Sequence, residues 1–152
     1  MTSPSRTLLP GRTLSRKIVG PDGQPALKVE ELTAAAGQQL WITFESKKSP
    51  WRQGVFIATH GLLGAAGTKA RALTLWSDSA PRTTVVDILE TDGRIILYNI
   101  WDSGRGVGPF ESQSWTSGMY VQDLPDGSRR YSCADIGLEP DFRRIVFTVR
   151  VA

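Results

Sequence analysis

Cysteine and histidine are scarce in this chain, and their scarcity limits the chemistry that it can perform. The 152 residues include one cysteine, Cys133, and one histidine, His60. A lone cysteine cannot form an internal disulfide, and one cysteine with one histidine cannot supply the usual zinc-binding patterns. Cys133 and His60 could act as a nucleophile and its base only if their strands adjoin. We expect instead that Cys133 is a core residue and that His60 lies in a loop or at a strand end. We predict no metal and no cofactor, with calcium at Asp102, Glu111 and Asp135 as an alternative that lacks the regular spacing of a calcium loop.

Long apolar runs are also absent. No segment approaches the roughly 20 apolar residues of a membrane span, and residues 1–12, MTSPSRTLLPGR, lack the apolar stretch of a secretory signal. A single cysteine suits a reducing compartment, so we expect a cytoplasmic protein with no membrane span. The length suits one domain that is large enough to bury a core.

Acidic residues are missing from the first 21 positions, although the net charge of the chain is only +3. Four basic residues in this part, Arg6, Arg12, Arg16 and Lys17, form an arm that could touch phosphates. Nucleic-acid binders usually carry denser basic stripes, so the composition argues against such a partner. We predict a flexible basic arm at residues 1–12, followed by one β-sandwich domain at residues 13–152.

Turn signals recur at short intervals and predict antiparallel β-structure. PDGQ (21–24), TDGR (91–94) and PDGS (125–128) each place Asp-Gly between strand-like segments, as tight hairpins require. Only VEELTAAAG (29–37) contains helix formers, and it reads equally well as a strand followed by a loop. We predict nine or ten strands, near residues 13–19, 25–30, 39–45, 53–59, 71–77, 82–90, 94–101, 117–123, 129–133 and 144–151.

Many short strands separated by turns favour an all-β, antiparallel two-sheet sandwich of the jelly-roll type, with a closed β-barrel as the alternative. The segment RIILYNIW (94–101) is apolar on both faces, which is typical of a central strand covered on both sides. Period-two alternation predicts which side chains face the core. The predicted core residues are Leu40, Ile42, Phe44, Val55, Ile57, Leu75, Ile96, Ile100, Ile145, Phe147 and Val149.

A glycine-rich, polar segment follows this strand and is the best candidate for a site. The glycines of GRGVG (104–108) do not open a helix, so a nucleotide-phosphate loop is not indicated. Trp101 and Trp115 lie among polar side chains, and such rings can stack on sugars while their neighbours bind hydroxyl groups. In an alternating strand Asn99 and Trp101 share a face. The predicted ligand-binding residues are Asn99, Trp101, Asp102, Arg105, Glu111, Gln113 and Trp115.

The sequence favours a non-catalytic ligand-binding module, possibly lectin-like, that takes a glycan or another small polar ligand. A first alternative is a small β-fold enzyme that uses Asp102, Glu111 or His60 as an acid or base. A second alternative is an assembly or interaction subunit, for which a homo-oligomer is one form. The loop itself has a structural interpretation too, as a self-packed connection with Asp102 bonded to backbone amides or paired with Arg105.

Overall fold

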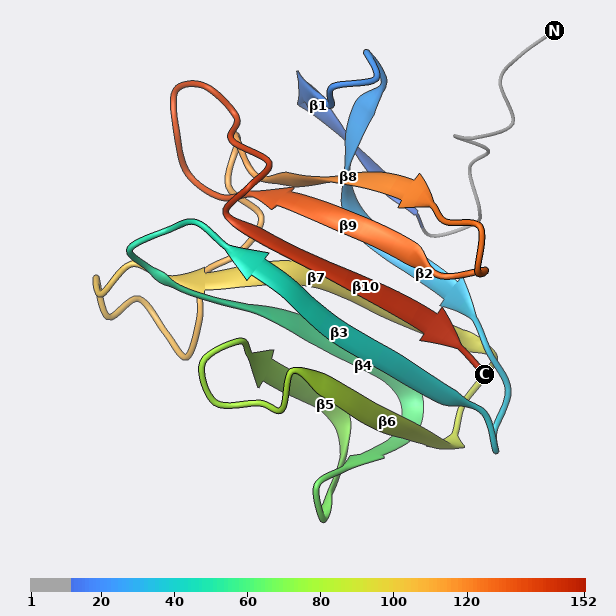
Figure 1. Cartoon of the computed structure of the whole chain (residues 1–152). Coiled ribbons are helices and arrows are strands. Elements are labelled where there is room, and N and C mark those ends of the chain that lie inside the picture. The colour runs from blue at the N-terminus through green and yellow to red at the C-terminus, as the bar shows by residue number, and fades with distance from the viewer. Residues whose placement is uncertain (1–11) are drawn as a thin grey trace, which may run out of the picture.

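The computed structural model describes residues 12–152, and in this range it contains ten antiparallel strands and no helix (Figure 1). Residues 1–11, most of the expected arm, lie outside the described residues. Within residues 12–152 there is accordingly no helix with the length and apolar character needed to cross a membrane. The strands are β1 Thr13–Val19, β2 Pro25–Thr33, β3 Gln39–Lys47, β4 Arg52–Ala65, β5 Thr68–Trp76, β6 Thr83–Glu90, β7 Arg94–Asp102, β8 Gly118–Asp123, β9 Arg129–Ala134 and β10 Ile145–Val151.

The strands close into a barrel of eight strands, so the sandwich prediction is wrong and its barrel alternative is confirmed. The order around the barrel is β2-β7-β4-β6-β3-β10-β9-β8, and β8 pairs back to β2. β1 and β5 lie outside this ring, each paired with a single strand, β2 and β4 respectively. A sandwich would leave its two sheets without hydrogen bonds between them, whereas here the ladder is continuous.

The strand and turn predictions hold well, with one exception. All ten predicted segments are strands, and PDGQ and PDGS connect the hairpins β1–β2 and β8–β9. TDGR does not form a hairpin, because β6 and β7 both run antiparallel to β4 and pair with successive parts of it. Residues 29–37 contain the end of β2, followed by a loop, rather than a helix.

The core lies inside the barrel, and the predicted core residues are buried apart from Ile96. On β7 the residues that point inward are Ile95 and Leu97, which are fully buried. Ile96 and Tyr98 alternate with them and lie half-buried on the outer face. An apolar sequence on both faces therefore marks a strand whose outer face is partly covered, since Phe110 of the following loop packs against Phe56 beside Tyr98.

A fully buried carboxylate, Glu30, lies inside the barrel on β2. Tyr131 Oη donates to it at 2.7 Å, Arg12 Nε and Nη2 donate at 2.6 and 2.9 Å, and Arg129 Nη1 donates at 3.2 Å. Burial and the neighbouring carboxylate raise the pKa of Tyr131 well above its usual value, so the phenol stays protonated and donates. Arg12, the last residue of the expected arm, is thus part of the buried structure.

Removing Arg12 should destabilise the fold strongly, because the buried Glu30 carboxylate would lose the two hydrogen bonds that Arg12 donates. We expect Arg12→Met to lower the free energy of unfolding by about 3–5 kcal/mol in denaturant titrations. The matched control is Arg16→Met on the exposed part of β1, which should change it by about 0.5 kcal/mol or less. Equal effects of the two substitutions would show that the buried network contributes nothing specific.

Two glycines of β4 give a direct steric test of the strand packing. A Cβ atom on Gly54 would lie 2.3 Å from the carbonyl oxygen of Leu75 on β5, so backbone must shift to admit it. A Cβ atom on Gly64 would have the side-chain carbon Cδ1 of Leu89 as its nearest neighbour, at 3.3 Å, and the nearest backbone atom, the carbonyl oxygen of Thr68, at an ordinary contact distance of 3.8 Å.

We predict that Gly54→Ala lowers the free energy of unfolding by about 3 kcal/mol. Gly64→Ala should cost about 1 kcal/mol or less, because a side chain can move where backbone cannot. Urea titration of both variants measures the difference. If Gly54→Ala is as stable as Gly64→Ala, the β4–β5 pairing described above is incorrect.

Candidate functional site

Two long loops gather at one end of the barrel, on the left in Figure 1. They are residues 103–117, between β7 and β8, and residues 135–144, between β9 and β10. Thr116 joins them, since its Oγ1 donates to the Asp135 carbonyl at 3.3 Å and accepts from Gly137 N at 3.0 Å. The predicted site residues all belong to the first loop or to the strand that leads into it.

Asn99 and Trp101 share one face of β7 as predicted, but this face points into the barrel. Asn99 is 2% exposed and its Nδ2 donates to the carbonyl oxygen of Ala134 at 3.1 Å. Trp101 is 1% exposed. Their side chains therefore fill the end of the barrel beneath the loops and are not presented to solvent.

Two residues outside the predicted ligand-binding set, Gln53 and Asp135, complete this buried polar cluster. Gln53 of β4 lies opposite Trp101 in the β4–β7 register, and its Nε2 donates to Asp135 Oδ2 at 2.8 Å. Burial raises the pKa of Asp135, against the opposing effects of the Gln53 hydrogen bond and of Arg144, whose Nε lies 3.4 Å from Oδ1. The two-residue alternation of a strand could have identified Gln53, because it lies two positions before the inward-facing Val55 and so on the same face of β4.

Two polar atoms in this cluster have no hydrogen-bond partner among the described residues, Trp101 Nε1 and Gln53 Oε1. One is a donor and the other an acceptor, and they belong to side chains that face each other across the β4–β7 pair. Such a pair of groups suits an ordered water molecule. The cluster fastens the loop that begins at Asp135 onto the barrel, which is a capping arrangement.

Asp102, Arg105 and Glu111 stabilise the 103–117 loop from within. Asp102 Oδ1 accepts from the backbone N of Gly104 at 2.8 Å. Arg105 pairs with Glu111 and not with Asp102, through its Nη2 and through Nε at 3.0 Å. Glu111 also accepts from Ser103 N at 2.6 Å, and its backbone forms a bridge with Trp101. Asp102 thus stabilises the start of the loop, while Ser103, Arg105 and Glu111 close a ring of bonds within it.

The Glu111 carboxyl group should titrate far below its ordinary range. Burial alone would raise its pKa, but the hydrogen bonds from Ser103 and Arg105 and the charge of Arg105 together lower it to about 2. Because the folded pKa lies below the usual value of 4.5, the ionised group stabilises the loop above about pH 4.5, and this stabilisation is lost as the pH falls toward 2.

We predict that carboxyl-carbon NMR will place the midpoint for Glu111 near pH 2. In Arg105→Gln the midpoint should rise, because one charge and its hydrogen bonds are lost. Arg143→Gln, which removes the partner of Asp141 in the other loop, is the control and should leave the Glu111 midpoint in place. An ordinary Glu111 midpoint in the unmodified protein would contradict the ring of bonds.

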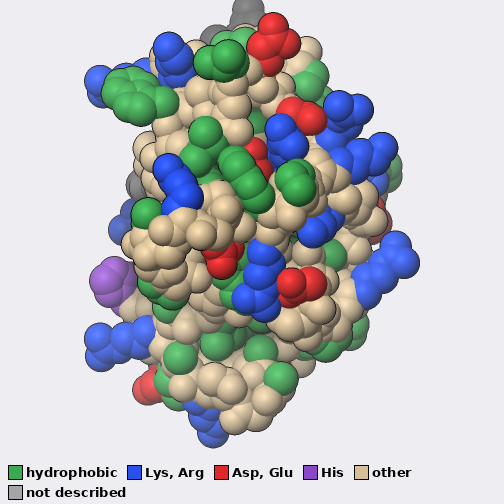
Figure 2. Space-filling model, turned by 90° about the vertical axis from the view of Figure 1, so that its left-hand side faces the viewer, with side chains coloured by type: hydrophobic (Ala, Val, Ile, Leu, Met, Phe, Trp, Pro, Cys, Tyr) green, Lys and Arg blue, Asp and Glu red, His purple; other side chains and the backbone are tan. Residues whose placement is uncertain are grey.

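Trp115 and Gln113 lie on the outside of the same loop and form a different site. The Trp115 side chain is 80% exposed, although it is large and apolar. It lines a shallow pocket of about 260 Å³. Figure 2, which looks at this end of the molecule, shows hydrophobic side chains exposed among Lys and Arg side chains. The pocket is lined by Leu14, Ser15, Arg16, Lys17, Lys28, Gln113, Ser114 and Trp115.

Lys28 of β2 holds the loop that carries Trp115. Its Nζ donates to the carbonyl oxygen of Ser114 and, at 2.9 Å each, to the carbonyl oxygen and Oγ of Ser117. Burial lowers the pKa of Lys28. Gln113 Nε2 donates to the Lys28 carbonyl oxygen at 3.1 Å, and Gln113 itself has a positive φ of 58°. The residues on both sides of Trp115 are therefore tied to a barrel strand.

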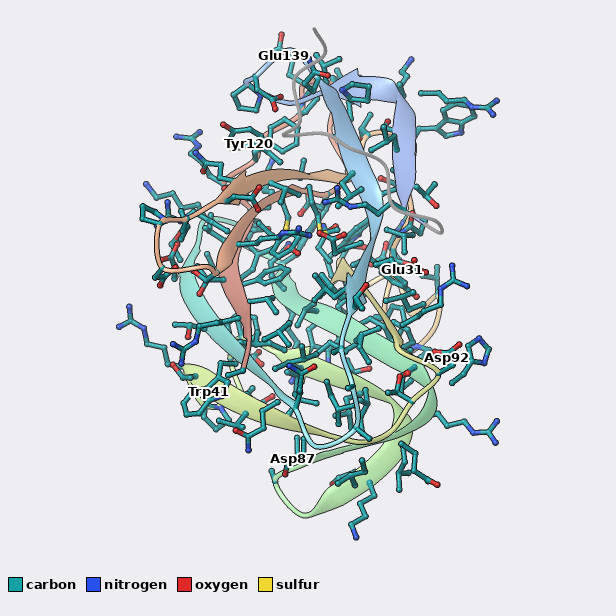
Figure 3. The ribbon with its side chains drawn as sticks, turned by 90° about the vertical axis from the view of Figure 1, so that its right-hand side faces the viewer. Glu31, Trp41, Asp87, Asp92, Tyr120 and Glu139 are labelled. Carbon is teal, nitrogen blue, oxygen red and sulfur yellow. The ribbon has the colours of Figure 1, made fainter. Side chains whose placement is uncertain are left out.

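The other aromatic and catalytic candidates do not join this pocket. Trp41, labelled in Figure 3, lies on the outer wall with the Arg150 guanidinium 5.6 Å from its ring centre. His60 is exposed and lines an outer groove of about 370 Å³ with Phe56, whereas Cys133 is fully buried in the core. Burial raises the pKa of the Cys133 thiol well above its usual value, which opposes a nucleophilic role.

Metal binding also finds no group of ligands in this structure. Among residues 12–152 there is no set of three or more His, Cys, Asp or Glu side chains placed to hold a metal ion. The calcium alternative at Asp102, Glu111 and Asp135 therefore has no geometric support. Glu111 instead pairs with Arg105, and Asp135 with Gln53 and Arg144.

Comparison of the chain with protein-family models, with curated proteins and with solved structures finds no match.

Proposed function

We propose that this protein is a binding module whose ligand, a glycan or another small polar molecule, stacks on Trp115. The observation that carries the proposal is the 80% exposure of this ring on a loop that Lys28 fastens to the barrel. An exposed tryptophan leaves a large apolar surface in water, and a fixed one loses little conformational entropy when a ligand covers it. The pocket beside the ring gives such a ligand a place to lie.

Polar groups around the ring fit a ligand that carries hydroxyl groups. The exposed amide of Gln113 supplies its oxygen as an acceptor and the second hydrogen of Nε2 as a donor, the first being bonded to the Lys28 carbonyl. Ser114 also lines the pocket, but its hydroxyl oxygen is buried, so the amide of Gln113 is the polar side-chain group beside the ring that a ligand can reach. A flat apolar ring beside an exposed amide is a combination by which proteins hold sugars in shallow sites.

The enzyme alternative receives less support from the same geometry. Asp102 is bonded to a backbone amide and Glu111 to Arg105, so neither carboxylate is placed to move a proton on a ligand at Trp115. His60 lines a separate groove. A binding role requires none of these groups, which is why we prefer it.

Substitution of Trp115 separates binding from folding. We expect Trp115→Ala to weaken glycan binding at least about fivefold, since loss of one stacking ring costs about 1–3 kcal/mol in comparable stacking sites. The melting temperature should stay nearly the same, because the side chain is exposed. Val107→Ala, at another exposed apolar position of the loop, is the control and should bind normally.

The measurement is a glycan array read with all three proteins, with thermal melting of each. Binding that survives Trp115→Ala would place the ligand elsewhere. An array on which the unmodified protein binds no glycan would overturn the glycan form of the proposal. Early melting of Trp115→Ala would show that the ring supports the fold rather than a ligand.

A further inference from the structure

We infer that the ligand of the Trp115 pocket is anionic, a saccharide that carries a carboxylate, sulfate or phosphate group. The inference rests on the proposed function and adds the charge of the ligand to it. Three of the residues that line the pocket are cationic, Arg16, Lys17 and Lys28. No Asp or Glu is found among the described residues that line it, so the pocket has a positive potential that no carboxylate within it offsets.

An irregularity in β1 places two of these cations side by side. In a regular strand Arg16 and Lys17 would point to opposite faces, yet both are exposed and line the pocket. The β1–β2 register shifts between Leu14 and Val19. The Ser15 hydroxyl stabilises this bulged turn, since Oγ accepts from Lys17 N and from Ile18 N at 3.0 Å each.

The third cation, Lys28, holds the loop and also contributes its charge. Its ammonium donates to two carbonyl oxygens and a hydroxyl group, all of them neutral acceptors. Its positive charge therefore remains uncompensated by these bonds. Because the group is partly buried, salt screens its field less than that of a fully exposed lysine. An anionic group bound near Arg16 and Lys17 would gain from this field as well.

The pocket suits an acidic sugar better than a nucleic-acid strand. Proteins that bind single strands combine a basic groove with several aromatic rings on which successive bases stack. Trp115 is the one aromatic residue among the described residues that line this pocket. One ring and one exposed amide beside two exposed cations match a single sugar ring with an acidic substituent.

The test compares acidic glycans with neutral partners of the same ring structure. The probes are oligogalacturonate and its methyl ester, and glucose 6-phosphate and glucose, with AMP and adenosine as the nucleotide arm. A glycan array that holds sialylated, sulfated and uronate glycans beside their neutral forms extends the comparison. The proteins are the unmodified chain, the double variant Arg16→Gln/Lys17→Gln, and a charge-matched control, Lys69→Gln/Arg71→Gln, on exposed β5.

We expect at least one acidic glycan to bind more tightly than its neutral form by about tenfold at low salt, because two charge contacts are gained. The Arg16/Lys17 variant should lose this preference, and the Lys69/Arg71 control should keep it. Raising the salt to about 0.5 M should reduce the preference as well.

The outcomes separate the charge inference from the proposed function. Equal, Trp115-dependent binding of acidic and neutral glycans would overturn the charge inference and leave the proposed function standing. If no glycan binds through Trp115, both fall. A preference for AMP over adenosine that depends on Arg16 and Lys17, without any acidic-glycan binding, would overturn the saccharide assignment.

Discussion

The barrel closes where β2 meets β8, and few backbone hydrogen bonds are available at this seam. The β2–β8 register consists of the single pair Leu27 and Met119, whereas β4 and β7 pair continuously from Arg52 to Thr59 on β4. Side chains of β2 add the missing connections. Glu30 receives hydrogen bonds from Tyr131 and Arg129 on β9, and Lys28 donates to the segment just before β8. A carboxylate can be buried at this place because these donors surround it.

The candidate site depends on the same seam. Lys28 lies next to the closing pair and fastens the residues on either side of Trp115, so the position of the ring follows from the way the barrel closes. Inside the same end of the barrel, Asn99 donates to the Ala134 carbonyl and Gln53 donates to Asp135, and these bonds hold the neighbouring loop. The polar residues of the long loop thus divide into an inner group that caps the barrel and an outer group that faces solvent.

Local sequence patterns were sufficient to predict the strands but not their closure. Period-two alternation and Asp-Gly turns located all ten strands, because both signals act over a few residues. Closure of the barrel requires β8 to pair with β2. These two strands are more than 80 residues apart in the chain, and no local pattern encodes their pairing. TDGR was misassigned for the same reason, since the pairing of β6 and β7 with β4 decides its geometry.

The arrangement of the candidate site residues depends on long-range contacts in the same way. Strand alternation predicts that Asn99 and Trp101 share a face of β7, but it does not indicate that this face points into the barrel. Arg105 pairs with Glu111 and not with Asp102, which is closer to it in the sequence, because the loop folds back to form the Trp101–Glu111 bridge. The exposure of Trp115 and its association with Arg16, Lys17 and Lys28 depend on β1 and β2 lying beside the loop. That juxtaposition is a property of the folded barrel alone.

The central claim is that Lys28 connects β2 to the segment before β8 and thereby fixes the Trp115 loop. Backbone ¹⁵N relaxation tests it most directly, measured for residues 114–119 in the unmodified protein and in Lys28→Met. The methionine keeps much of the apolar stem and removes the ammonium donor. We predict order parameters of about 0.85 for these residues in the unmodified protein and below about 0.6 in the variant. The order parameters of β3 and β10 should be the same in both proteins. Order parameters that stay high in the variant, or that are already low in the unmodified protein, would contradict the account.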